Sequence, residues 1–118
     1  MSSLPKEPAR FERRKFPRFY ISARLTLAIE DESLRESIGL GEPADISLGG
    51  IRVRNLPAAS NVKVGDRLGL LLLDHGDAIS LHGEVVHHGS PDTFGVEFRS
   101  LSPTDARSVR GIIERLHK

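Results

Sequence analysis

The sequence predicts a mainly β fold, a small antiparallel barrel or sandwich, followed by a single helix. Two observations favour this class. Several short runs alternate apolar and polar residues or are apolar throughout, and turn-type residues separate each run from the next. The chain ends differently, with apolar residues at helical spacing. At 118 residues it is long enough for one domain with its own core.

The first half of the chain predicts two strands around an irregular connection. Apolar and polar residues alternate over residues 21–29, which is typical of a strand with one buried face. Residues 30–41 are acidic and contain glycine, so we expect a turn or an irregular edge there. We expect Pro43 to keep its segment out of a central strand, because proline cannot donate a ladder hydrogen bond. Ile51 and Val53 then alternate with arginines and predict a short strand.

The second half contains the clearest strands. Residues 56–66 read as a loop that closes with the turn Val64-Gly65-Asp66. Asp74-His75-Gly76-Asp77 is typical of a hairpin turn, and Gly83 is expected to mark a bulge or bend. Apolar or alternating runs predict three strands, at residues 68–73, 78–88 and 94–98.

A helix is predicted over residues 103–117. Ser102 is a suitable N-cap, Pro103 fits the first helical position, and Asp105 lies where the helix dipole favours an acid. The apolar residues of this segment recur with i, i+3, i+4, i+7 spacing, at Val109, Ile112, Ile113 and Leu116. We expect this apolar face to close an open end of the barrel.

Composition excludes several kinds of protein. The chain has no cysteine, which rules out disulfides, thiolate zinc sites and cysteine nucleophiles. No apolar run approaches the length of a membrane span, and the N-terminus lacks the apolar stretch of a signal peptide. We therefore expect a cytoplasmic protein without a membrane partner.

The charge is uneven although the net charge is only +1. Residues 1–24 hold seven Lys/Arg against two Glu, a balance of +5, so the rest of the chain is at −4. We expect residues 1–12 to be a disordered lead-in. A positive arm on a mildly acidic body indicates an anionic partner, although a solvated basic tail has the same composition.

Arg14 and Arg18 form an R-x-x-x-R motif at the end of this arm. Arginine has a planar guanidinium group that forms paired hydrogen bonds with phosphate or with the O6 and N7 atoms of guanine, and that also stacks on flat bases. Pro17 restricts how the neighbouring residues are presented. Alone the motif is weak, because residue frequencies place it in roughly a quarter of chains this long.

A second motif, D-x-S-x-x-G, runs from Asp45 through Ser47 to Gly50. The Asp45 carboxylate offers acceptors for guanine N–H groups or for an arginine, and Ser47 both donates and accepts. Gly50 permits a positive φ, or lets a planar ligand come close to the backbone. The alternative is a tight turn in which Asp45 and Ser47 only cap local N–H groups.

In this order, and ahead of further strands and one helix, the two motifs resemble the PilZ family of small β-barrel receptors for cyclic di-GMP. Val64-Gly65-Asp66 and Gly95-Val96-Glu97-Phe98 also look like segments common in that family. The resemblance covers residues 13–118. It implies an antiparallel six-stranded β-barrel of split-barrel type over about residues 20–100, a C-terminal helix over about 103–117, and a flexible basic N-terminal arm.

The resemblance also implies binding without catalysis and without a cofactor. Arg14 and Arg18 would contact phosphate and guanine of cyclic di-GMP, while Asp45, Ser47 and Gly50 would line the guanine site. In this family an arginine before R-x-x-x-R, here Arg13, accompanies an intercalated dimer of the ligand. Arg52 and His87 are weaker candidates at the border of the site.

A mechanism follows from the charge of the arm. A ligand with two phosphates would neutralise the arm and fold it against the barrel, which would create a surface for an unidentified downstream protein. We expect this change to be the signal that the protein passes on.

Two other functions stay open. A basic-armed barrel with exposed Arg52 and Arg54 would also suit nucleic acid, although aromatic residues are scarce. A PilZ-like adaptor that binds proteins without nucleotide is the other. We expect no metal site, since His82 and His88 would share a strand face without a third ligand. The loose dinucleotide fingerprint at residues 39–44 lacks the helix it requires, and no nucleophile elbow indicates an enzyme.

Overall fold

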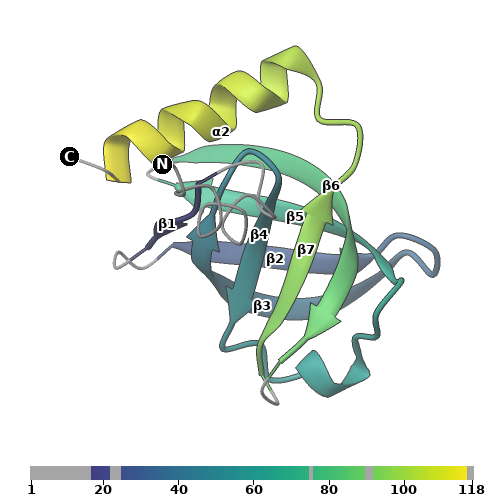
Figure 1. The fold of residues 1–118 in the computed structure, drawn as a ribbon. Coiled ribbons are helices and arrows are strands. Elements are labelled where there is room, and N and C mark those ends of the chain that lie inside the picture. The colour runs from purple at the N-terminus through teal and green to yellow at the C-terminus, as the bar shows by residue number, and fades with distance from the viewer. Residues whose placement is uncertain (1–16, 22–24, 75, 90–91, 117–118) are drawn as a thin grey trace, which may run out of the picture.

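The protein is a closed ring of antiparallel strands with a helix packed against it (Figure 1). The structure is a computed structural model that describes residues 17–21, 25–74, 76–89 and 92–116. Its strands are β1 (Phe19–Tyr20), β2 (Thr26–Asp31), β3 (Glu36–Ile46), β4 (Gly50–Arg54), β5 (Arg67–Asp74), β6 (Asp77–His88) and β7 (Phe94–Phe98). A 3-10 turn, η1 (Ala59–Asn61), and the helix α2 (Pro103–Leu116) complete the described elements.

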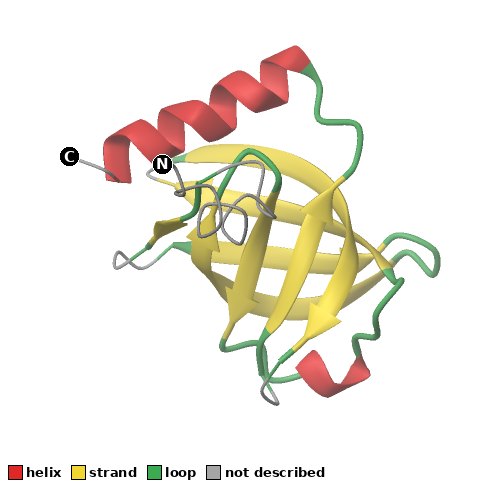
Figure 2. Ribbon diagram, in the orientation of Figure 1, coloured by secondary structure: helices red, strands yellow, loops and turns green. Residues whose placement is uncertain are grey.

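Six strands form the ring (Figure 2), in the order β3-β2-β5-β6-β7-β4, and the pairing of β4 with β3 closes it. Every pairing is antiparallel, and β1 adds two residues to the outside of this order by pairing with β3. The predicted six-stranded antiparallel architecture with a C-terminal helix is therefore confirmed. The basic arm up to residue 16 lies outside the described residues, so its flexibility stays a prediction, as does the domain division at residue 12.

The interior is built from the alternating residues of each strand. In β4, Ile51 and Val53 are buried while the arginines between and after them are half-exposed. Phe94 is the largest of the fully buried side chains. Inward-facing aliphatic residues from β2, β5 and β6 complete the same core, including Leu27, Ile29, Leu68, Leu70, Leu72, Leu81 and Val85. Burial of these faces is what drives the ring to close.

The first half of the chain is more regular than its sequence suggests. The segment expected to be an irregular edge is a turn only over residues 32–35, and from Glu36 onward it is the strand β3. Pro43 lies within β3, at a register shift in the ladder with β4 and beyond Gly41, where the ladder with β2 ends. Its missing N–H is therefore tolerated. The strand expected over residues 21–29 begins at Thr26, and residues 22–24 are outside the described ranges.

Most predicted turns are confirmed. Gly65 has a φ of 98°, and the Asp66 N–H donates to the Lys63 carbonyl at 3.0 Å, which closes the loop before β5. The hairpin between β5 and β6 pairs Asp74 with Asp77. Residues 56–66 form the expected loop, with η1 inside it.

The sequence predicts a bulge or bend at Gly83, and the structure has no bulge there. Gly83 pairs regularly with Leu68 and with Phe98, and the register shift in β6 falls between Val85 and His87. Glycine is required at this position for space, because a Cβ atom would lie 2.6 Å from the carbonyl oxygen of Glu97. Sequence alone indicates that the glycine is special, but the neighbouring strand decides why.

The helix begins as predicted and reaches Leu116. The Ser102 hydroxyl accepts a hydrogen bond from the Asp105 N–H at 3.0 Å, which is a normal N-cap. Val109 and Ile112 are buried in the same core as the inward-facing strand residues, so α2 covers the ring on the side of β6. Among the described helices, none has the length and apolar character needed to cross a membrane.

Candidate functional site

The D-x-S-x-x-G motif forms the tight turn between β3 and β4. The Ser47 N–H donates to the Gly50 carbonyl at 2.9 Å, and the buried Ser47 hydroxyl accepts hydrogen bonds from the N–H groups of Gly49 (3.0 Å) and Gly50 (3.2 Å). The hydroxyl thus satisfies the two backbone donors that the turn leaves free. Ser47 therefore stabilises the turn by capping local N–H groups, which is the alternative that the sequence analysis considered for this residue.

Gly50 is required because strands approach closely at the end of this turn. It pairs with Glu97 of β7, and a Cβ atom added to it would collide with the carbonyl oxygen of Val96. Its φ is not in the positive region, in contrast to Gly65. The motif glycine therefore fits against the backbone of β7, and the positive φ considered from the sequence is not what selects it.

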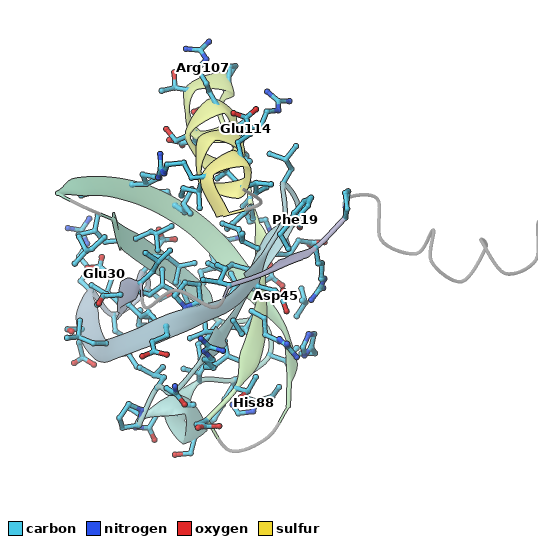
Figure 3. All side chains as sticks on the ribbon, turned by 90° about the vertical axis from the view of Figure 1, so that its left-hand side faces the viewer. Phe19, Glu30, Asp45, His88, Arg107 and Glu114 are labelled. Atoms are coloured by element: carbon cyan, nitrogen blue, oxygen red, sulfur yellow. The ribbon has the colours of Figure 1, made fainter. Side chains whose placement is uncertain are left out.

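Asp45 does not cap the turn. The Asp45 side chain is only 3% exposed although it carries a carboxylate, and two arginines compensate this charge. The Nη1 atom of Arg18 donates to Oδ1 at 3.3 Å, and the Nε atom of Arg52 lies 2.9 Å from Oδ2. The Nε–H of Arg52 is not aligned with the carboxylate, so this second contact is an ion pair without a hydrogen bond. Figure 3 shows Asp45 on the same side of the ring as Phe19 of β1.

The strand register produces this cluster. The turn over residues 47–50 places Ile46 opposite Ile51 and Asp45 opposite Arg52, so the latter two form a direct cross-strand pair. β1 pairs with the same part of β3, which brings the preceding Arg18 to the other carboxylate oxygen. Arg52, a candidate for the border of the site in the sequence analysis, is thus a direct partner of Asp45. The hairpin register that follows from a four-residue turn is the signal that could have found it.

The two arginines of the cluster keep part of their surface in water. The Arg18 and Arg52 side chains are 32% and 37% exposed, while the carboxylate between them is buried. The cluster therefore consists of a buried carboxylate, which can accept hydrogen bonds, and two partly accessible guanidinium groups that flank it. Such an arrangement suits a flat, polar, anionic ligand, because arginine forks bind phosphate and guanine edges and a carboxylate binds guanine N–H groups.

Arg54 has a different role from the one expected. Its Nε atom lies 3.4 Å from Oε1 of Glu42, and its Nη2 donates to the Ile21 carbonyl at 3.3 Å. Arg52 and Arg54, taken from the sequence as exposed, are both half-buried and both face acidic neighbours. The nucleic-acid alternative depended on these two arginines as a free basic strip, and this support for it is lost.

Two further pairs of residues from the sequence analysis remain: two arginines of the arm, and two histidines that were not expected to form a metal site. Arg13 and Arg14 lie outside the described residues, so their roles stay predictions. His82 and His88 do not share a face, because the register shift between them reverses the alternation. His82 pairs with Glu32 on the outside, and His88 is half-buried against Phe94. Across the described part of the chain, no group of three His, Asp or Glu side chains is placed to hold a metal ion.

A small apolar hollow of about 200 Å³ lies beside the cluster. It separates the N-terminal end of the described chain from α2, and Figure 3 shows Phe19 below Glu114 of the helix. The hollow is lined by Pro17, Phe19, Leu48, Arg110, Ile113 and Glu114. Pro17 and Phe19 flank Arg18, and Leu48 belongs to the turn, so this hollow connects the charged cluster to the helix.

Comparisons with known proteins agree with this architecture. The PilZ domain of YcgR from Escherichia coli, solved with c-di-GMP, superposes with a TM-score of 0.70 at 19% identity, over 89% of this chain and 92% of that chain. The PilZ domain of CeSA from a cellulose-synthesizing bacterium gives 0.66 at 14% identity, over 86% and 99%. The MrkH–c-di-GMP complex of K. pneumonia gives 0.66 at 21% identity, over 89% of this chain and 52% of that chain.

These likenesses concern the fold, since all three identities are below a quarter. A search of curated proteins finds no match to the sequence. The family model described as PilZ domain matches residues 12–115, which is nearly the whole chain. This protein therefore belongs to the PilZ domain family.

Proposed function

We propose that this protein is a receptor for cyclic di-GMP and that it acts by binding, without catalysis. The observation that carries the proposal is the buried Asp45 carboxylate held between Arg18 and Arg52. A charge this deeply buried is costly unless it is paired, and here both partners keep an accessible side. Solved structures that share the fold, those of YcgR and MrkH, contain c-di-GMP, which supports the same ligand.

The proposed chemistry is an exchange of partners. Guanine presents N1–H and N2–H donors that suit the Asp45 carboxylate, and O6 and N7 acceptors that suit an arginine fork. When the guanine edge binds Asp45, Arg18 is released from its 3.3 Å contact to bind the ligand phosphate. Ser47 and Gly50 contribute by keeping the turn and Asp45 in position.

The arm supplies the remaining charge in this proposal. Arg14 completes the R-x-x-x-R grip on phosphate and guanine. Arg13, next to it, favours a stacked pair of ligand molecules over a single one. A dimer carries four phosphates, so three arginines of the arm segment are needed to balance a large part of its charge.

We further propose that the arm folds onto the ring when ligand binds and that a partner protein reads this change in the cytoplasm. The apolar hollow between Pro17, Phe19, Leu48 and α2 supports this route. Any movement of Arg18 shifts its two neighbours in the chain, both of which line the hollow. The helix on the other side of the hollow would then present an altered surface to the partner.

Calorimetric titration with cyclic di-GMP tests the proposal. The wild-type protein is expected to bind, with a stoichiometry near two ligands per chain if Arg13 has the proposed role. Arg18→Ala and Asp45→Asn are expected to abolish binding. Arg99→Ala is the matched control, because Arg99 forms an exposed ion pair with Glu84 on the outside of the ring. A folded wild-type protein that does not bind would overturn the receptor function and leave the nucleotide-independent adaptor.

A further inference from the structure

A row of four residues crosses the outside of the ring next to the charged cluster. Asp45 of β3 is opposite Arg52 of β4, Arg52 is opposite Gly95 of β7, and Gly95 is opposite His87 of β6. Neighbouring strands lie about 4.8 Å apart, so the row extends about 14 Å from Asp45 to His87. His87 is therefore aligned with the charged cluster although it lies far from it in the sequence.

A β-bulge aims His87 outward. Val85 is buried and pairs with Val96, and the register shift follows directly after it. Val86 and His87 are both exposed, whereas regular alternation would return His87 to the buried side of Val85. Bulges commonly re-aim a side chain next to a functional site. The extra residue in β6 places an imidazole on the same surface as Arg52.

Gly95 leaves the space that the imidazole occupies. A Cβ atom at Gly95 would lie 2.9 Å from both Cδ2 and Cε1 of His87 and would also collide with Nε2. The His87 ring therefore lies across the backbone of Gly95. The φ of Gly95 is not positive, so the backbone conformation does not call for glycine here. The missing side chain therefore lets the His87 ring lie close against the sheet, in the same row as Arg52.

We propose that Arg52, Gly95 and His87 form a second base-binding subsite of the cyclic di-GMP site. A guanine base stacks on the exposed face of the His87 imidazole, and the accessible side of Arg52 pairs with the O6 and N7 edge of that base. This inference rests on the proposed function, since Asp45 binds the first guanine of the same ligand. The second base belongs either to the same ligand molecule or to the second molecule of a stacked dimer.

Titration of His87 variants with cyclic di-GMP tests the subsite. His87→Ala is expected to weaken binding by about tenfold, the usual effect of losing one base–aromatic stack. His87→Phe keeps a flat ring and is expected to restore most of the affinity. His82→Ala is the matched control, because His82 is an exposed histidine of the same strand that pairs with Glu32 away from the row.

Gly95→Ala provides an independent test. The added methyl displaces the His87 ring, which can swing away because it is exposed, and the variant is expected to weaken binding as His87→Ala does. Combining Gly95→Ala with His87→Ala should then add little further loss, since both changes remove the same stack. Fully additive losses would show that the two residues act separately and would overturn the subsite.

The outcomes separate the subsite from the receptor function. If the wild-type protein does not bind cyclic di-GMP, the proposed function fails. If it binds, and Asp45→Asn abolishes binding while His87→Ala leaves the affinity unchanged, only the second subsite is refuted. If His87→Ala lowers the stoichiometry from two ligands to one, the second base comes from the second molecule of a dimer. A lower affinity at unchanged stoichiometry assigns it to the same molecule.

Discussion

Replacing Gly50 with alanine is expected to destabilise the protein through a backbone collision. The added Cβ atom would overlap the carbonyl oxygen of Val96 and lie 3.3 Å from the Cα atom of Glu97. Both are main-chain atoms of β7, which cannot swing aside as a flexible side chain does. The end of the β4–β7 ladder must therefore open, starting at the pair formed by Gly50 and Glu97.

The size of the effect follows from this collision. Forcing an extra methyl group into a packed site costs about 1–3 kcal/mol, and we expect about 2 kcal/mol because no side chain can absorb the strain. In a domain of this length, that corresponds to a melting temperature lower by about 8 °C. Gly111→Ala is the matched control, since Gly111 lies inside α2 with no atom within 4 Å of its added Cβ. It should stabilise the protein by about 0.5–1 kcal/mol, because alanine is the better helix former.

Urea unfolding followed by circular dichroism measures both variants on one scale. The free energy of unfolding should fall for Gly50→Ala and rise for Gly111→Ala, with unchanged dependence on urea concentration. Equal stability of Gly50→Ala and wild type would refute the close approach of β4 and β7 at the motif. A lower free energy of unfolding for Gly111→Ala would show that this glycine makes a close packing contact that is absent from the structure.

The remaining predictions concern the turn, the cluster and the helix. Ser47→Ala removes the acceptor for two backbone N–H groups and should cost about 1–2 kcal/mol in the same unfolding experiment; a neutral result would contradict its role in the turn. Asp45→Asn should abolish binding of cyclic di-GMP yet lower stability by only about 1 kcal/mol, because both arginines are about one-third exposed and can be solvated. A loss of several kcal/mol would indicate a purely structural cluster. Ser102→Ala should cost about 1 kcal/mol through the lost cap, whereas the exposed Thr104→Ala should be nearly neutral.

Much of the fold could be predicted from local patterns. The helix, its Ser102 cap and the hairpin before β6 depend on residues that are close together in the chain, so short-range spacing is enough to find them. The same holds for the turn at Gly65. The two motifs also stand out without a structure, because their residue types suit a guanine nucleotide and their order matches one family.

The sequence by itself thus determined the β class, the helix and the family, whereas tertiary structure decided what the individual site residues do. Asp45 is buried between Arg18 and Arg52 because three strands meet there in one register. The bulge after Val85 aims His87 outward, although strand periodicity within β6 alone gives no sign of it. Periodicity reports how one segment is buried, but the partner of a side chain across a sheet depends on the register of strands that are distant in the chain.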